Sequence, residues 1–453
     1  MNLYRSTQMI VSLLQPKRVL FVALLFIFSP IVAFAQQNAD GSAYSRFGIG
    51  ELFRFSTSQI QALGGGGTAL TSYNYVNLSN PATWADQSLT RLTTGVQFQG
   101  IELSNGSGNE SRLNSSMLQA FQFSFPIRRG KLGASIAFTP YSRVAHTVPQ
   151  EPVSIPGDLQ DPSSYVINFE GQGGIQQATV GLGFRPSPRI SLGLSANFLF
   201  GIIEEIRRTE VFTDDGASDP LLSFSQTIFN KETRLSGFTS TAGALVTLPG
   251  ILSDNDALSI GASISFPTSL TGTRSRTFGI DPDQLETIGD ETKGDIDLPL
   301  RTNIGLSYHP NRSWIILADL TLEPWSSFDS ELDLPGFVPQ GASSFKDRTR
   351  FSLGVDFQPS SNVLDSYFRR VALRLGYYYD TGYIDVVQNT SVNTSAFTGG
   401  VSLPTLFPGT RIDLNLEVGR RGMTDFGLVR ETFYRIQVNV NIGERWFERR
   451  KLG

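Results

Sequence analysis

The sequence is poor in the residues from which most reactive centres are built. It has no cysteine among its 453 residues and only two histidines, His146 and His309. The absence of cysteine excludes a disulfide framework, a thiolate nucleophile and a Cys-ligated zinc site. Two histidines are too few for most imidazole-based metal sites. We therefore expect no bound metal and no cofactor.

Long apolar runs are also missing after the first 35 residues. A membrane-spanning helix needs about 20 mainly apolar residues, so none is predicted there. The charged residues are spread along the chain and form no basic block, and the net charge is -4. Nucleic acid is therefore not an expected partner.

The first 35 residues have the pattern of a secretory signal. Arg5, Lys17 and Arg18 precede an apolar run over 19–34 that contains Pro30 and ends in an Ala-Phe-Ala motif. That order of basic, apolar and small residues is typical of a cleaved signal peptide. The run is shorter than a spanning helix, which argues against a membrane anchor. We predict a signal peptide over 1–35 and an exported protein.

What the sequence has instead is alternation with a period of two. Ile412, Leu414, Leu416 and Val418 alternate with Arg411, Asp413, Asn415 and Glu417. Such alternation predicts strands with one apolar and one polar face. We expect fourteen strands, at about 89–100, 115–127, 131–145, 174–186, 189–204, 234–248, 256–273, 297–308, 313–323, 348–358, 370–382, 396–404, 410–420 and 431–443.

A soluble sandwich would alternate too, so strand length and the links must decide. Many runs reach the ~9–11 residues of a tilted spanning strand. Links after even strands are mostly short, and links after odd strands are longer and polar, at 145–173, 204–234, 274–296 and 325–347. Short turns on one side and long loops on the other are typical of outer-membrane barrels. We predict an all-β fold, a 14-stranded antiparallel transmembrane β-barrel over 88–443, in contact with outer-membrane lipid.

Residues 36–87 precede the first predicted strand and are unlike a linker. They are rich in Gly, Ser and Asn but carry many apolar anchors, which a disordered segment would lack. A barrel of this width leaks unless it is filled. We predict an N-terminal lumenal hatch, or plug, with key residues Phe47, Phe53, Leu63, Gly64, Gly65, Gly66, Gly67, Asn80, Pro81 and Ala82.

Charged residues gather on the predicted inner faces of the later strands. The candidates are Arg301, Asp319, Arg350, Asp356, Arg374, Asp413 and Glu417. Opposed charges inside a barrel usually pair and order the lumen, but they also serve to contact a ligand. The pattern alone leaves both roles open.

Three short motifs resemble the FadL family of outer-membrane transporters for long-chain fatty acids and other hydrophobic compounds. They are "IQALGGGGTAL" followed by "NLSNPATW" before strand one, "RTNIGLSYHPNRSWIILADLTLEPW", and "RLGYYYDTG". The resemblance implies that a hydrophobic small molecule or lipid enters a lumenal pocket. It then leaves sideways through a gap where the third strand is kinked.

Pro140 lies in the middle of the predicted third strand and is the candidate lateral gate. Proline cannot donate a hydrogen bond to the strand ladder, so it belongs at edges or bulges. A break there would open the wall, but a simple bulge near the rim is an equal alternative. The expected consequence of Pro140→Ala is restored pairing and slower uptake of an apolar substrate.

The C-terminal tail over 444–453 is basic and is predicted to lie in the periplasm. Trp446 and Phe447 are candidates for the aromatic signal that the barrel-assembly machinery reads, so this machinery is an expected partner. The tail resembles those of barrels of the Bacteroidetes type. That resemblance raises an alternative function, a PorV-type shuttle for protein secretion. A general polar porin is a third alternative, and a monomer is expected in each case.

An enzyme is not expected. His146 and His309 fall at opposite ends of the predicted barrel, so they cannot share a Ser–His site. The sequence has no G-x-S-x-G nucleophile elbow. Asp214, Asp215 and Asp219 lie close together but lack the twelve-residue calcium-loop pattern.

Overall fold

The computed structural model describes residues 41–53, 57–72, 74–108, 110–149, 153–155, 163–213, 226–335, 345–362, 364–387, 390–407 and 409–445. The predicted signal peptide, the tail beyond residue 445 and the aspartates at 214, 215 and 219 lie outside these ranges. Within them, no helix is long and apolar enough to cross a membrane.

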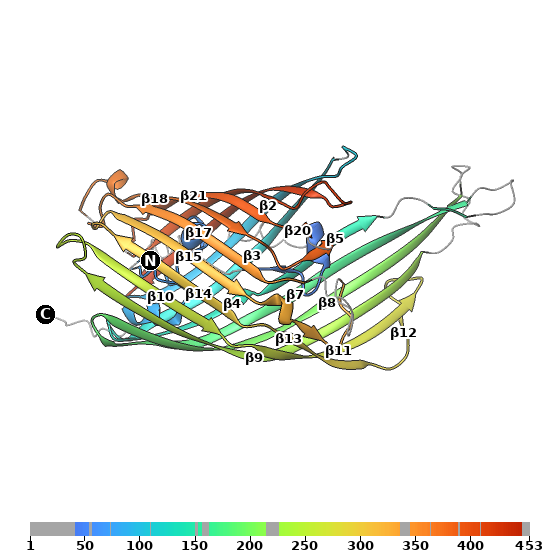
Figure 1. Cartoon of the computed structure of the whole chain (residues 1–453), viewed down its shortest axis with the longest axis horizontal. Coiled ribbons are helices and arrows are strands. Elements are labelled where there is room, and N and C mark those ends of the chain that lie inside the picture. The colour runs from blue at the N-terminus through green and yellow to red at the C-terminus, as the bar shows by residue number, and fades with distance from the viewer. Residues whose placement is uncertain are drawn as a thin grey trace, which may run out of the picture.

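The strands form one closed antiparallel barrel of fourteen, which confirms the predicted fold class (Figure 1). Eleven strands are continuous: β2 (Thr90–Ser104), β3 (Glu110–Arg128), β7 (Ser163–Ser187), β8 (Ile190–Thr213), β9 (Thr227–Pro249), β15 (Trp314–Glu323), β17 (Arg348–Phe357), β18 (Ala372–Asp380), β21 (Thr394–Pro404), β22 (Arg411–Arg421) and β23 (Arg430–Glu444). Three are interrupted: β4 (Leu132–Pro140) with β5 (Ser142–Pro149), β10 (Ala257–Ser265) with β11 (Thr268–Gly279), and β13 (Thr292–Leu298) with β14 (Arg301–His309). Pairing of β2 with β23 closes the barrel.

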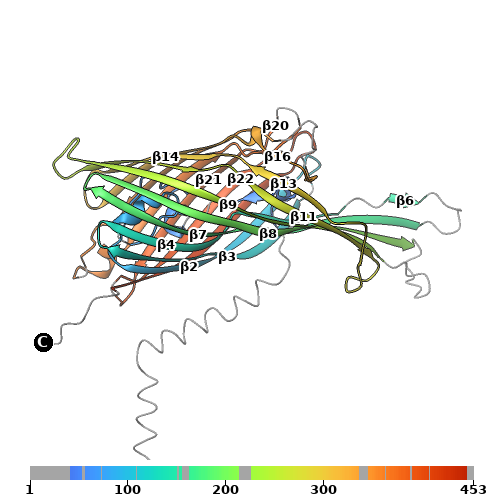
Figure 2. The same cartoon turned by 90° about the horizontal axis from the view of Figure 1, so that it is seen from below.

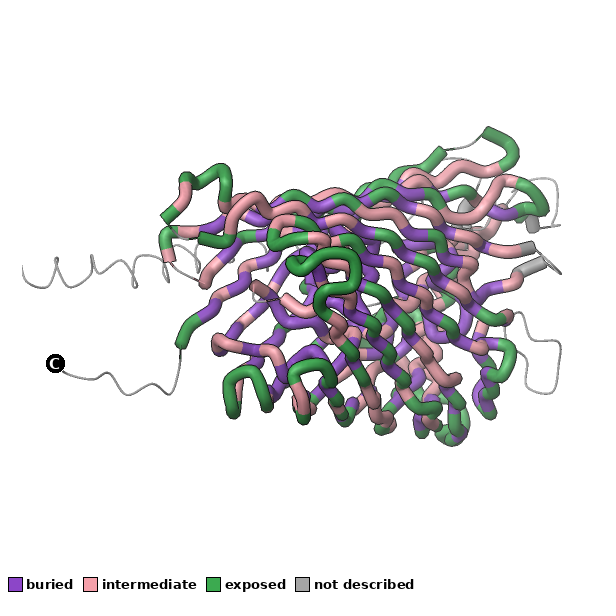
Figure 3. The backbone as a smooth tube through the Cα atoms, turned by 60° about the vertical axis from the view of Figure 1, so that its left-hand side comes forward, coloured by how far each residue is buried: buried purple, intermediate pink, exposed green. Residues whose placement is uncertain are grey.

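Alternation along each strand separates a lipid-facing surface from the lumen, as the colouring of Figure 3 shows. On β22, Ile412, Leu414, Leu416 and Val418 are exposed on the outside, whereas Arg411, Asp413, Asn415 and Glu417 are buried. Closure satisfies the backbone groups that no water reaches inside a bilayer. The chain is thus a barrel of the bacterial outer membrane.

Three neighbouring strands are much longer than a membrane requires. β7, β8 and β9 have 25, 24 and 23 residues, against the ~9–11 that span a bilayer. They extend beyond the barrel at the end away from the C-terminus (Figure 2). The predicted boundaries were wrong here, because the extensions carry polar pairs such as Arg208–Glu170 and Lys231–Glu205 and therefore lack apolar alternation.

The described residues of 41–87, called the N-terminal segment below, pack against the inner faces of the barrel strands. The segment contains η1 (Ala43–Arg46), β1 (Glu51–Leu52), α3 (Ser58–Gln61) and η2 (Pro81–Asp86). Several barrel strands carry a glycine at the point where the N-terminal segment approaches them. A Cβ at Gly193 would lie 2.2 Å from the carbonyl carbon of Pro81, and one at Gly376 would lie 2.2 Å from the Gly64 nitrogen. These glycines let the segment approach the barrel backbone.

Candidate functional site

The barrel wall is interrupted where the third strand breaks. β4 ends at Pro140, and its pairing with β3 runs from Leu132 to Phe138. Beyond the break, β5 pairs with β7 and with β1, and no described residue of β5 pairs with β3. The stretch of β3 from 110 to 120 therefore has only β2 as a ladder partner. We call this break in the ladder, between the stretch of β3 and β5, the lateral gap.

Two glycines opposite the break build the kink. Gly173 and Gly174 have φ values of +101° and +134°, which other residues rarely adopt. A Cβ on Gly174 would lie 2.3 Å from the Ser142 carbonyl oxygen, and one on Gly173 would lie 2.1 Å from that of Ile202. Sequence reasoning found Pro140 but missed these glycines. The available signal was a Gly-Gly pair inside a strand pattern, which indicates a bulge or a close backbone approach.

Beside the gap, the N-terminal segment replaces β3 as the partner of β5. Glu51 and Leu52 of β1 pair with Arg143 and Ser142, and the Phe53 amide donates to the Tyr141 carbonyl at 2.9 Å. The third strand thus turns inward to hold this segment.

Glu51 also ties β1 to β22 and β23, on the other side of β2 and β3. Its carboxylate accepts from Arg435 at 2.8 Å and from Arg421. Burial favours a raised pKa for Glu51, but Arg421 and Arg435 outweigh burial and lower the pKa to about 2. The carboxylate is therefore ionised at neutral pH and anchors β1.

Of the lumenal charges named from sequence, Arg301 is half-buried and the others are buried, and five of the seven take part in two groups of ion pairs. Arg301 contacts Glu323 at 2.5 Å, Arg348 bridges Glu323 (3.1 Å) and Asp380 (2.6 Å), and Arg350 lies 3.6 Å from Asp380. Separately, Arg374 bridges Asp356 at 2.8 Å and Asp413 at 3.3 Å.

Several predicted charges contact the N-terminal segment directly. Asp319 accepts from the Thr68 amide at 2.7 Å, and Arg350 donates to the Gly64 carbonyl at 3.0 Å. Glu417 accepts from Arg435 at 3.0 Å and from Gln61 at 2.8 Å. Sequence reasoning missed Arg348, Asp380, Arg421, Glu431 and Arg435, although they alternate on the same inner faces.

The residues predicted for the hatch lie along the N-terminal segment in distinct surroundings. Phe47 belongs to an apolar cluster with Tyr44 and Ile49, Leu63 packs with Ile60 and Leu70, and Ala82 packs with Ala69 and Leu245. Asn80 caps η2 by accepting from the Ala82 amide at 3.0 Å, with Pro81 at the first helical position. Gly64, Gly65 and Gly67 have positive φ, and a Cβ on Gly66 would lie 2.7 Å from Asp319 Oδ2.

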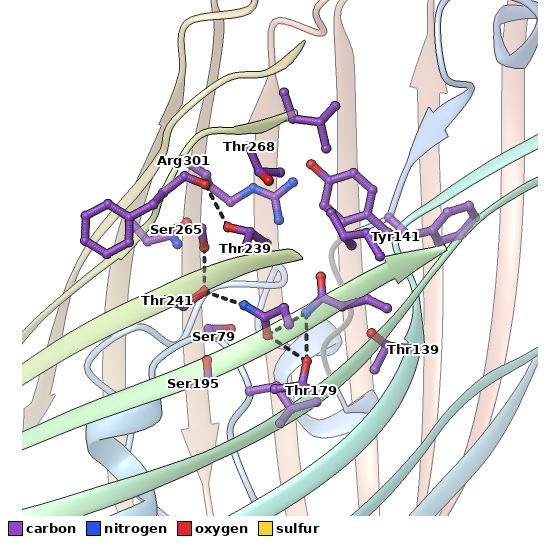
Figure 4. A pocket seen from close by; sticks show the side chains of 18 of the residues that line it. Ser79, Thr139, Tyr141, Thr179, Ser195, Thr239, Thr241, Ser265, Thr268 and Arg301 are labelled. Atoms are coloured by element: carbon purple, nitrogen blue, oxygen red, sulfur yellow. Dashed lines mark hydrogen bonds between the residues drawn. The ribbon is translucent and has the colours of Figure 1, made fainter. Parts of the chain in front are cut away.

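Two polar cavities flank the break at Pro140. One, of about 100 Å³, is lined by hydroxyls and amides such as Thr179, Asn197 and Thr241, which bond to one another (Figure 4). The other, of about 70 Å³, lies on the gap side between Met117 of β3 and the charged groups of Glu51 and Arg435. Both also touch Phe53.

A larger and more apolar cavity, the outer chamber, lies beneath the strand extensions. It has about 550 Å³ and is lined by Phe47, Val148, Phe169, Ile206 and Phe229, among others. Arg46, Arg207 and His146 add polar groups to its wall. Within the described residues, no group of three or more potential metal-ligating side chains lies together.

Solved structures with a similar fold are outer-membrane channels. The chain covers 100% of a structure titled "CymD monoaromatic hydrocarbon channel" with 89% of its own length (14% identity, TM-score 0.53). It covers 98% of the Ralstonia pickettii toluene transporter TbuX with 86% of its length (14% identity, TM-score 0.52). It also covers 98% of a Pseudomonas aeruginosa FadL homologue with 86% of its length (12% identity, TM-score 0.57). At such low sequence identities, the structural similarity shows a shared fold and nothing further.

No curated protein matches the chain. The model of the BamG family, in contrast, matches residues 16–453, which is nearly the whole sequence. Because this match spans nearly the whole sequence, the chain belongs to the BamG family.

Proposed function

We propose that this barrel takes up hydrophobic compounds across the outer membrane. The N-terminal segment acts as its hatch, the outer chamber captures the compound, and the lateral gap releases it sideways. The observation that carries the proposal is the gap, where eleven residues of β3, 110–120, lack a second strand. An opening in the wall allows an apolar solute to leave without crossing the polar end of the barrel.

The position of the gap supports this route. Outward-facing Leu118 and Phe121 on β3 are exposed and apolar, whereas Asn114 and Arg112 further along are polar. The gap therefore begins at the outer border of the lipid-facing surface. The apolar wall of the outer chamber supports capture there, and the printed titles of the CymD and TbuX structures name a hydrocarbon channel and a toluene transporter.

Closing the gap chemically tests the proposal. Arg143 of β5 reaches across it, with Nη1 3.5 Å from Ser115 Oγ on β3. Because the chain has no cysteine, Ser115→Cys with Arg143→Cys gives a single reactive pair for a short bismaleimide. We expect the cross-linker to abolish uptake of radiolabelled toluene or oleate into proteoliposomes.

A matched control joins strands that are already paired. Gly100 and Asn114 are register partners on β2 and β3, so cross-linking Gly100→Cys to Asn114→Cys leaves the gap open and should leave uptake unchanged. Pro140→Ala gives a milder test and should slow uptake. Full uptake through the cross-linked Ser115–Arg143 pair would rule out the lateral route.

A second function, as a protein-binding barrel, is favoured by two observations. The family name carries the Bam prefix of the barrel-assembly machinery. The cavities beside the gap are small and polar, which suits a structural lumen better than a path for hydrocarbons. In this function the barrel is a partner of the barrel-assembly machinery. The PorV-type secretion shuttle is a related alternative.

Depletion in the native host separates the two functions. Loss of an uptake channel should reduce growth on a hydrophobic substrate and leave other outer-membrane barrels at normal levels. Loss of a barrel-assembly component should lower many folded outer-membrane barrels together. Native-gel isolation of the protein would then reveal a complex rather than a monomer.

A further inference from the structure

The periplasmic end of the barrel carries an unusual link. Residues 358–371 join β17 to β18 and form the longest link at that end. Its apolar side chains point into solvent: Leu364 is 92% exposed and Phe368 is 84% exposed. On the neighbouring link between β21 and β22, Leu406 is 98% exposed. Apolar side chains gathered this way commonly mark an interaction site.

Internal hydrogen bonds hold this link in shape. The Ser360 amide donates to the Arg369 carbonyl at 2.8 Å, and the Asp365 amide donates to the Asn362 carbonyl at 3.2 Å. The rings of Tyr367 and Phe368 meet edge to face at 5.7 Å within η4 (Tyr367–Arg370). The exposed side chains are therefore presented by a preformed surface, which lowers the entropic cost of binding.

A cavity of about 580 Å³ lies between the two links. Arg370 and Arg411 line it together with Tyr367 and Leu406, and its described lining contains no carboxylate. Arg411 donates to the Arg370 carbonyl at 2.8 Å. Arg370 Nε is buried and has no hydrogen-bond partner within the described residues. The site thus presents two arginine side chains beside apolar surface, which calls for an apolar ligand with a carboxylate.

The cavity also touches the N-terminal segment. Asn74 lines it, and Asn74 Nδ2 donates to Gln358 Oε1 at 3.3 Å. Because Asn74 lies inside the barrel mouth, an occupant would sit under the lumen rather than against the lipid-facing wall. This position favours a protein over a membrane lipid.

We propose that the β17–β18 and β21–β22 links form a docking surface for a periplasmic protein segment with apolar side chains and an adjacent carboxylate. Leu364, Phe368 and Leu406 receive the apolar side chains, and Arg370 receives the carboxylate. The occupant contacts the N-terminal segment at Asn74. This surface is separate from the lateral gap and stands whether or not the barrel transports hydrophobic compounds.

Photo-cross-linking in intact cells tests the docking surface. A benzophenone amino acid replaces Phe368 in one variant and Leu406 in a second. In the control variant it replaces Leu252. Leu252 is also apolar and exposed (79%) but lies on the distant β9–β10 link. Heat-dependent gel mobility confirms that each barrel is folded before the adducts are compared.

We expect one discrete protein adduct from position 368 or 406 and none from 252. The cross-linked peptide, identified by mass spectrometry, should carry Asp or Glu beside apolar residues. Arg370→Gln should reduce the adduct about tenfold, the effect of losing ~1.4 kcal/mol of binding, and Arg370→Lys should restore part of it. Adducts with lipid only, an absence of adducts from both folded variants, or equal adducts from 252 would overturn the proposal.

Discussion

At the scale of single residues, Gly64 shows how tightly the N-terminal segment fits. Its φ is +78°, and a Cβ would lie 2.6 Å from the Tyr377 carbonyl oxygen. We expect Gly64→Ala to combine backbone strain with a clash, because a non-glycine residue held in this region costs about 1–3 kcal/mol. The thermal midpoint in detergent should fall by several degrees.

Gly130 provides the matched comparison for this substitution. Its φ is +65°, but a Cβ added there, in the β3–β4 turn, would have no atom within 4 Å. Gly130→Ala therefore isolates the cost of backbone conformation. If both variants lose the same stability, the close approach at Gly64 contributes nothing.

The charge on Glu51 predicts how the N-terminal segment responds to pH. Its folded-state pKa of about 2 lies below the ordinary value of 4.5. Its stabilisation is therefore present above pH 4.5 and is lost as the pH falls through about 2. We expect the ion conductance of the barrel in planar bilayers to stay low from pH 7 to pH 4 and to rise only near pH 2.

Removing the charge of Glu51 by substitution should raise the ion conductance at every pH. Glu51→Gln leaves Arg421 and Arg435 with one fewer carboxylate, and breaking a buried pair costs about 3–5 kcal/mol. Conductance at pH 7 should increase. Glu102→Gln is the control, because its pair with Arg112 is exposed and contributes ~1 kcal/mol or less.

Alternation predicted which charged side chains face the lumen, but it did not predict which of them form ion pairs. Alternation predicted the inward positions of Arg374 and Asp413. Their pairing depends on register across β18, β21 and β22, which no local pattern encodes. For the same reason the contact of Asp319 with the Thr68 amide could not be predicted.

At the scale of elements, η2 depends on glycines of the strands around it. We expect Gly193→Val on β8 to displace η2, because the new side chain would overlap Pro81. Stepwise ion currents should then appear in planar bilayers. Gly399→Val on β21 is the control, since its Cβ would have its nearest neighbour at 3.5 Å. Equal conductance in the two variants would contradict this role of Gly193.

Element positions were predictable and element lengths were not. The fourteen strands follow the sequence pattern, because a lipid-facing surface imposes apolar residues at every second position. Beyond the membrane this constraint ends, so apolar residues of the extensions such as Phe169, Ile206 and Phe229 are interspersed with charged pairs and give no regular apolar alternation. The kink was expected from Pro140 alone. The two glycines opposite it, Gly173 and Gly174, lie on the neighbouring strand β7, so the pattern of the third strand does not indicate them.

At the scale of the whole molecule, the proposed hatch is the segment that precedes the first barrel strand, whose described residues contact the inner faces of the strands. We expect deletion of residues 41–87 to produce an open pore, because a barrel of this width is a channel when empty. Single-channel recording should show large steps for this variant and none for the intact protein. Heat-dependent gel mobility checks that the shortened chain still forms a barrel.

The contacts of the N-terminal segment also constrain the order of assembly. Ser42 donates to Glu431, 389 positions later in the chain, and Glu51 contacts Arg435 on the final strand. The earliest part of the chain therefore reaches its place only when the last strands are present. Contacts so distant in sequence slow folding. An emerging chain therefore cannot complete its interior before its last strand is in place.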